Sequence, residues 1–221
     1  MKKCVQGILF DFDGTLCDSQ KFIYQSFRIT LTKHNLYVPL WEEFLELCRG
    51  MALVEAYQAL TNLENVEHLC KTHRKWQADN FQLVDLFPHV HKTLAKIQSM
   101  GIPMVIVTNR GDAVYETLES TNISKFFHTV RHTKNTRDGL QKPHPQMLLD
   151  ALELVGIDPS SACMVGDMRE DMEAGKAAGI HKVVGVSYGF LGHGIAKHDP
   201  DHLIHDIREL LEILKIYNEA A

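Results

Sequence analysis

The stretch Gly7-Ile8-Leu9-Phe10-Asp11-Phe12-Asp13-Gly14-Thr15 decides how this sequence is interpreted. Residues 4–10 form a short apolar run, which predicts a strand buried on both faces, as the strands of parallel sheets are. Two aspartates, Asp11 and Asp13, follow the run with one phenylalanine between them. Parallel sheets bind ligands beyond the carboxyl ends of their strands, so these two aspartates are the first candidate functional residues.

Beyond residue 86 the sequence alternates between apolar strands and amphipathic helices. Pro88 is expected to open the first of these helices, and Gly101 to end it. Further helices are predicted at roughly 112–121, 148–155, 170–178 and 207–214, and strands at 104–107, 126–131, 162–165 and 183–186. Alternation of this kind with fully apolar strands predicts an α/β fold, a Rossmann-like parallel sheet with helices on both faces.

The segment between the first strand and this alternating part has a different pattern. Residues 18–85 contain no strand-like run and read as consecutive amphipathic helices, each with one apolar stripe. The stripes are Ile23, Phe27 and Leu31; Trp41, Phe44, Leu45 and Cys48; and Leu53, Ala56, Tyr57 and Leu60. We therefore expect an α/β core domain of residues 1–16 and 86–221, interrupted by a helical domain of residues 17–85.

Composition and charge limit the classes of function. The chain has 221 residues, of which 45% are hydrophobic, so it can bury a sizeable core and is neither disordered nor fibrous. Its net charge of −5 gives no electrostatic reason to expect a nucleic acid or a membrane as partner. The longest apolar runs are too short to span a bilayer. Five cysteines form no C-x-x-C pair, which favours a reduced, cytoplasmic protein. The sequence does not indicate the oligomeric state.

Three more strand ends carry polar residues. They are Thr108-Asn109, Lys142-Pro143-His144-Pro145 and the run from Gly166 to Asp171, Gly-Asp-Met-Arg-Glu-Asp. Together with the two aspartates after the first strand, these residues indicate a phosphoryl-transfer site. The Thr108 hydroxyl and the Asn109 amide could bind phosphate oxygens, and Lys142 supplies fixed positive charge for a phosphate dianion and for the nucleophile.

The carboxylates of this constellation also predict a metal ion. Asp11 and Asp13 are two residues apart, so one could attack phosphorus while the other reaches the bridging oxygen. Placed close to Asp167, they would repel each other unless a cation lay among them. Hard carboxylate oxygens without a cluster of histidines or cysteines suit Mg²⁺.

The four motifs, in this order, resemble those of the haloacid dehalogenase superfamily. The similarity spans essentially the whole chain, and the inserted helices look like the small helical (C1-type) cap of that superfamily. The closest resemblance is to its phosphoglycolate phosphatase-like branch. It rests on Lys142-Pro143-His144-Pro145, on the Gly-Asp-x-x-x-Asp run at residues 166–171, and on Gly185-Val186-Ser187-Tyr188-Gly189.

The resemblance implies a reaction and the residues that perform it. Asp11 would be the nucleophile that forms an aspartyl-phosphate, and Asp13 would protonate the leaving alcohol and then activate water. Thr108 and Asn109 would bind the phosphoryl group. The expected activity is Mg²⁺-dependent hydrolysis of a small phosphorylated metabolite, similar to phosphoglycolate.

The resemblance also implies where the metal ion lies. Asp11, the backbone carbonyl of Asp13 and Asp167 would hold Mg²⁺, and Asp171 would lie outside these ligands, near Lys142. Two interpretations compete with parts of this assignment: Lys134 could replace Lys142, and Asp171 could be only a favourable charge at a helix N-terminus.

Substrate specificity is expected to come from the cap, because the core motifs bind only the phosphoryl group. Arg49 and Gly50 fall between two amphipathic helices, where this branch of the superfamily carries its specificity loop. Arginine presents a planar fork that suits a carboxylate or a second anionic group, so Arg49 is a candidate substrate-binding residue. A helix-end arginine that interacts with the macrodipole explains Arg49 equally well.

Four other functions remain as alternatives. Phosphomutases of the β-phosphoglucomutase type commonly carry a histidine where this chain has Ile23, and this difference disfavours a mutase. Dehalogenases lack the second aspartate, here Asp13, so dehalogenase activity is also disfavoured. Inorganic pyrophosphatase belongs to the same branch. A catalytically silent binding protein on this fold is disfavoured by the intact Asp11, Asp13, Lys142 and Asp167, because it would not need a nucleophile together with an acid. The pair His89-x-His91 suggests zinc, but no further histidine or cysteine completes a site.

Overall fold

The computed structural model describes residues 4–48, 51 and 53–218. At its centre lies a sheet of six parallel strands in the order β5-β4-β1-β6-β7-β8. These strands are β1 (Gly7–Phe10), β4 (Met104–Thr108), β5 (Thr129–His132), β6 (Ala162–Gly166), β7 (Lys182–Val186) and β8 (His202–Ile204). Strand β1 lies between β4 and β6, so the residues that follow it are at the middle of the sheet edge.

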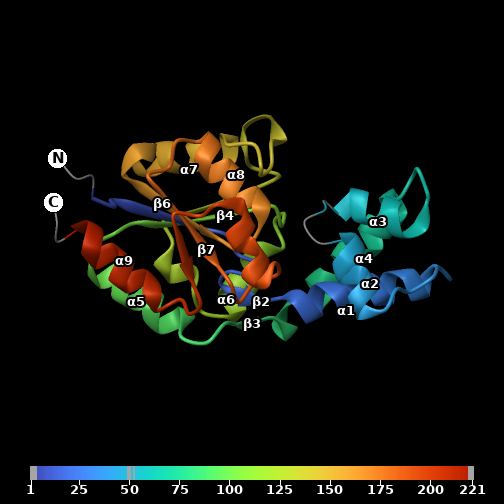
Figure 1. Ribbon diagram of the computed structural model, residues 1–221. Coiled ribbons are helices and arrows are strands. Elements are labelled where there is room, and N and C mark those ends of the chain that lie inside the picture. Colours follow the sequence, from blue (N-terminus) through green and yellow to red (C-terminus); the bar gives the residue numbers. More distant parts are fainter. Residues whose placement is uncertain (1–3, 49–50, 52, 219–221) are drawn as a thin grey trace.

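Side chains of the central strands alternate between two hydrophobic clusters. In β1, Ile8 and Phe10 belong to one cluster and Leu9 to the other. Helices α5 (Val90–Ser99), α6 (Val114–Ser120) and α9 (Glu209–Asn218) contribute to the first, and α7 (Gln146–Val155) and α8 (Arg169–Ala177) to the second. Figure 1 shows these two groups of helices on opposite faces of the sheet. The predicted α/β fold with helices on both faces is confirmed.

Four helices lie beside the sheet and have a core of their own (Figure 1). They are α1 (Gln20–Lys33), α2 (Trp41–Cys48), α3 (Leu53–Thr61) and α4 (Glu67–Asp79). Their third hydrophobic cluster is built from the predicted stripes, among them Phe27, Leu31, Phe44 and Tyr57. The chain passes from the sheet into these four helices and returns from them at one edge of the sheet, the edge where β1 ends.

Two short elements were missed by sequence analysis at the junction of these parts. Strand β2 (Cys17–Asp18) pairs with β3 (Asp85–Leu86) in an antiparallel ladder, so the two linkers lie side by side. Strand β8 was also missed, because it has only three residues and Ile204 alone among them is buried. All three strands are too short to show a hydrophobic period, and only their pairing partners reveal them.

Element boundaries differ from the predictions by a few residues. Helix α5 begins at Val90 rather than at Pro88, since His89 has a φ of 69° and lies in the left-handed region. The 3-10 helices are η1 (Phe81–Leu83), η2 (Ser124–Phe126), η3 (Arg137–Gly139), η4 (Pro159–Ser161) and η5 (Gly192–His198). No helix within the described ranges is long and apolar enough to cross a membrane.

Candidate active site

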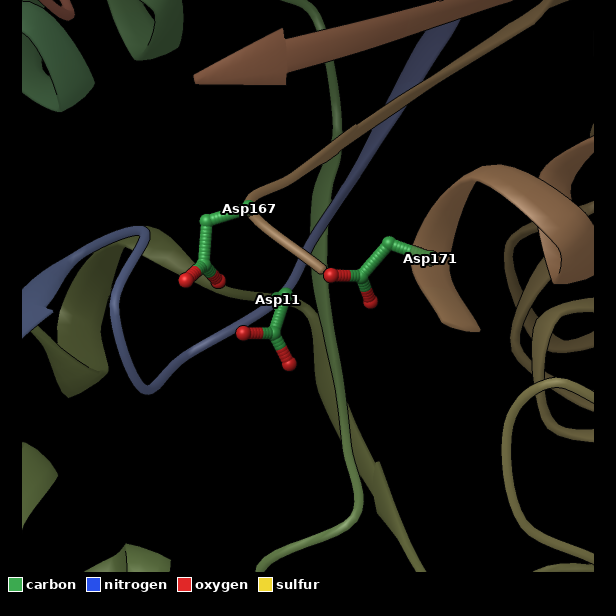
Figure 2. A group of neighbouring side chains, drawn as sticks. All are labelled: Asp11, Asp167 and Asp171. Carbon is green, nitrogen blue, oxygen red and sulfur yellow. The ribbon is translucent and has the colours of Figure 1, made fainter. Parts of the chain in front are cut away.

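Three aspartates meet at the carboxyl edge of the sheet (Figure 2). Asp11 follows β1, Asp167 follows β6, and Asp171 lies in the first turn of α8. All three are buried, and one carboxylate oxygen from each lies within 4.8 Å of the others. Among the described residues this is the only such group of three acidic, histidine or cysteine side chains, so no zinc cluster forms around His89 and His91.

Lys142 compensates part of this negative charge. Its Nζ donates hydrogen bonds of 2.6 Å to Asp11 Oδ1 and to Asp171 Oδ1, and of 2.9 Å to the Val107 carbonyl. Burial lowers the pKa of Lys142, but the carboxylates of Asp11 and Asp171 outweigh it and raise that pKa above its usual value. Lys142 is therefore a buried cation held between two acids.

Lys134, the competing lysine, has a different environment. It forms a 2.7 Å ion pair with Asp112, and both side chains are more than half exposed. The lysine that reaches the cluster, through Asp11 and Asp171, is thus Lys142.

The remaining charge in the cluster favours a further cation. Burial raises the pKa of Asp11 to about 7, although Lys142 lowers it, and the Asp171 charge raises it again. Burial also raises the pKa of Asp167 well above its usual range, and the negative charges of Asp11 and Asp171 raise it further. One lysine does not balance three buried carboxylates, so the donor set fits a hard divalent cation such as Mg²⁺.

The carboxylate of Asp167 is held rigidly by its surroundings. Its Oδ1 accepts a 3.1 Å hydrogen bond from the Thr15 hydroxyl, and its Oδ2 accepts a 2.6 Å bond from the Phe190 backbone N–H. A Cβ atom at Gly14 or at Gly189 would overlap with this carboxylate or its Cβ. The close approach of two loop backbones therefore requires glycine at both positions. Phe190, which follows the run at 185–189, was missed by sequence analysis.

Asp171 has two roles that sequence analysis treated as alternatives. Its Oδ2 accepts a 3.0 Å hydrogen bond from the Met168 backbone N–H, as an acidic residue in the first helical turn does. Its Oδ1 accepts from Lys142. Asp171 therefore caps helix α8 and fixes Lys142 with the same carboxylate.

Thr108 and Asn109 lie next to this cluster, at the end of β4. Thr108 is buried, and its Oγ1 accepts a 3.1 Å hydrogen bond from the Arg110 backbone N–H. The Asn109 side chain binds the backbone of Lys142 twice, donating to its carbonyl at 2.9 Å and accepting from its N–H at 3.0 Å. These bonds show that Asn109 holds the Lys142 loop, and its binding to a phosphoryl group stays a prediction.

Arg110 is the charged residue of this edge that sequence analysis missed. Its guanidinium donates a 3.2 Å hydrogen bond to Asp13 Oδ1, while the carboxylate of Asp11 faces Lys142. Its place directly after Thr108 and Asn109 was a signal that could have been used. Arg49, the candidate specificity residue, lies outside the described residues.

Comparison with known proteins finds relatives that span almost the whole chain. The family model of the haloacid dehalogenase-like hydrolases matches residues 8–186. The pyrophosphatase PpaX of Oceanobacillus iheyensis is 33% identical over 95% of this chain and 97% of its own length. The phosphoglycolate phosphatase of Escherichia coli O157:H7 is also 33% identical, over 95% of this chain and 92% of its own.

Solved structures agree with the fold described above. A protein described as a predicted phosphoglycolate phosphatase from Haemophilus somnus has a TM-score of 0.84 and 25% identity, over 95% of this chain and 97% of its own. CbbY of Rhodobacter sphaeroides, solved with xylulose-(1,5)bisphosphate, has a TM-score of 0.81 and 19% identity, over 93% of this chain and 96% of its own. At that identity the second likeness concerns the fold alone.

Proposed function

This chain belongs to the haloacid dehalogenase-like hydrolase family and is a phosphoric monoester hydrolase, and from this premise we propose that it hydrolyses a small phosphomonoester through an aspartyl-phosphate on Asp11. One observation carries the proposal. The Asp11 carboxylate lies at the carboxyl edge of the sheet, bonded to the buried Lys142 and beside Asp167. A carboxylate held by a cation at this place is suited to attack a phosphate dianion.

In the proposed first step, a carboxylate oxygen of Asp11 forms a bond to phosphorus, and the bond from phosphorus to the substrate oxygen breaks. Asp13 gives its proton to that leaving oxygen, so an alcohol departs. The Thr108 hydroxyl and the Lys142 ammonium stabilise the charge on the transferred phosphoryl oxygens.

In the second step, water attacks the phosphorus of the aspartyl-phosphate. Asp13, now ionised, takes a proton from this water, and the bond between phosphorus and the Asp11 oxygen breaks. Inorganic phosphate leaves, and Asp11 and Asp13 return to their starting states. Each group is thus restored after one turnover.

We propose that Mg²⁺ is held by Asp11, Asp167 and the backbone carbonyl of Asp13, with Asp171 bound to Lys142 beside them. When bound, this ion would lower the repulsion between the carboxylates and the incoming phosphate dianion. Support comes from the donor set, which is made of buried carboxylates that Lys142 compensates only in part.

We also propose that residues 17–85 act as a cap on a core of residues 1–16 and 86–221. Support comes from the separate hydrophobic cluster of α1–α4 and from the pairing of the linkers β2 and β3. Through this pairing, the chain enters and leaves the inserted helices at the same place. A cap attached by two adjacent strands can close over the site and exclude water. The location of the protein in the cytoplasm stays a prediction.

Two substrate classes fit this proposal, because the relatives named above include a phosphoglycolate phosphatase and a pyrophosphatase. A panel of 2-phosphoglycolate, sugar phosphates, inorganic pyrophosphate and p-nitrophenyl phosphate, assayed with Mg²⁺, separates them. We expect the highest kcat/KM for a small alkyl phosphate, with phosphoglycolate among the best. If activity were highest on pyrophosphate, the substrate class would be pyrophosphate instead of a small alkyl phosphate. If none of the compounds were hydrolysed, the proposed function would be overturned.

Removal of the metal ion is expected to abolish activity and to lower thermal stability. EDTA in excess should reduce hydrolysis of p-nitrophenyl phosphate to background, and added Mg²⁺ should restore it. Mg²⁺ should also raise the Tm of the wild-type protein, since a ligand that binds only the folded state stabilises it. The Asp167→Asn variant should lose most of this rise in Tm.

The matched control for this experiment is Asp112→Asn, which makes the same change in an exposed carboxylate that bonds to Lys134. This variant should keep both its activity and the full rise in Tm with Mg²⁺. Full activity of the wild-type protein in excess chelator would contradict the metal-assisted reaction, and an undiminished rise in Tm for Asp167→Asn would contradict the assigned ligand.

A further inference from the structure

Arg110 connects the proposed acid and base to the neighbouring helices. It follows β4, and its guanidinium Nη1 lies 3.2 Å from Asp13 Oδ1. The Arg110 side chain is 7% exposed and that of Asp13 is 18% exposed, so this ion pair is largely shielded from solvent. Shielding makes the pair stronger than a surface ion pair and limits the directions in which the Asp13 carboxylate can turn.

Two aromatic rings hold the guanidinium in place. Its central carbon lies 5.6 Å from the ring centroid of Phe12 and 5.5 Å from that of Phe22. Both distances are within the range at which a cation is attracted to an aromatic ring. The planar guanidinium, in contact with both rings, can therefore direct its N–H groups at Asp13 with little freedom of its own.

The two rings belong to different parts of the molecule. Phe12 lies between Asp11 and Asp13 in the loop after β1, whereas Phe22 lies in α1, the first of the four inserted helices. Phe22 also packs against Trp76 of α4, with ring centroids 5.3 Å apart. A movement of α1 and α4 relative to the sheet would thus change the contacts that hold Arg110.

We propose that Arg110 is a positioning residue that couples the placement of the inserted helices to the orientation of the Asp13 carboxylate. The inference rests on the proposed function, in which Asp13 protonates the leaving group. Arg110 itself touches no reacting atom in this scheme. When the helices keep Phe22 against the guanidinium, Arg110 holds the Oδ1 atom of Asp13 and thereby fixes the orientation in which the Oδ2 atom transfers the proton. Loss of either contact leaves the carboxylate free to turn away.

The test compares kcat/KM for two esters that differ in their need for an acid. The best alkyl phosphate of the panel has a poor leaving group that needs a proton, whereas p-nitrophenyl phosphate has a good one that needs little help. For Asp13→Asn we expect a loss of about 10²–10⁴-fold on the alkyl ester and a much smaller loss on the aryl ester. This variant calibrates the measurement.

Arg110→Met should show the same selectivity to a smaller degree. We expect kcat/KM to fall roughly 10- to 100-fold on the alkyl ester, as part of the contribution of the acid, and by less than about 3-fold on p-nitrophenyl phosphate. Competitive inhibition by inorganic phosphate should remain unchanged, which also shows that the site is folded. Arg110→Lys keeps the charge without the planar fork and should give an intermediate loss on the alkyl ester.

The contact with the inserted helices is tested by Phe22→Leu, with Phe27→Leu as its matched control. Both residues lie in α1, but Phe27 packs inside the third hydrophobic cluster, with its ring centroid 4.7 Å from that of Tyr57, and it is Phe22 that contacts Arg110. Phe22→Leu should lower kcat/KM for the alkyl ester selectively. Phe27→Leu should lower the Tm and leave the ratio of the two esters unchanged.

Three outcomes would overturn the inference. They are equal losses on both esters for Arg110→Met, a raised inhibition constant for phosphate, which would make Arg110 a phosphoryl-binding residue, and identical ester ratios for Phe22→Leu and Phe27→Leu. Failure of the proposed function would look different. In that case Asp13→Asn would show no selectivity between the esters, or the wild-type protein would hydrolyse neither.

Discussion

Replacement of Asp11 by Asn is expected to lower turnover by more than about 10⁴-fold, because removal of an enzyme nucleophile costs about 10⁶ where it has been measured. The change is nearly isosteric, but a neutral amide neither attacks phosphorus nor accepts a phosphoryl group. It also removes one negative charge from a buried cluster that Lys142 compensates only in part. The variant should therefore fold, and its Tm without metal ion should be at least that of the wild-type protein.

The measurement combines steady-state hydrolysis with a trapping experiment. Wild-type enzyme quenched in acid during turnover of a ³²P-labelled substrate should carry label on Asp11, whereas Asp11→Asn should carry none. Asp112→Asn, an exposed carboxylate changed in the same way, should be labelled like the wild type. Normal activity of Asp11→Asn would refute the nucleophile, and activity without a trapped label would refute the covalent intermediate.

Replacement of Lys142 by Met should have the second largest effect, on both stability and rate. The ammonium makes three hydrogen bonds, two of them to Asp11 and Asp171, and the side chain is 3% exposed. Removing one partner from a buried ion pair lowers the free energy of unfolding by about 3–5 kcal/mol. Loss of a charge that faces the transferred phosphoryl group should also reduce kcat by about 10²–10³-fold.

The stability loss of Lys142→Met should depend on pH in a defined direction. Lys142 lowers the pKa of Asp11, so its removal raises that pKa further above the value in the unfolded chain. The folded state then binds more protons than the unfolded state, and stability falls as the pH rises from about 4 to above 7. Urea unfolding without metal ion should therefore show a larger loss at pH 8 than at pH 5.

Lys134→Met is the matched control, because Lys134 forms an exposed ion pair with Asp112 on the neighbouring loop. Exposed pairs contribute about 0–1 kcal/mol, so this variant should unfold almost like the wild type at either pH. Its kcat should be unchanged. If Lys142→Met and Lys134→Met behaved alike, the buried lysine would have neither the structural nor the catalytic role assigned to it.

The sequence by itself determined the class of the fold and the place of the site. Apolar runs such as residues 104–107 are local patterns, and they report burial on both faces without knowledge of any partner. The stripes of α1, α2 and α3 likewise follow from helical spacing. Since parallel strands present their carboxyl ends at one edge, Asp11 and Asp167 could be placed together before any distance was known.

Only the tertiary structure decided which groups face each other. Asp11 and Lys142 are 131 positions apart, and Asp13 and Arg110 are 97 apart, so no local pattern links them. The order of the strands brings these loops together, and it also pairs the linkers β2 and β3 and seats the Phe190 N–H on Asp167. Periodicity reports only whether a residue is buried, whereas the partner of a buried charge depends on how distant segments pack.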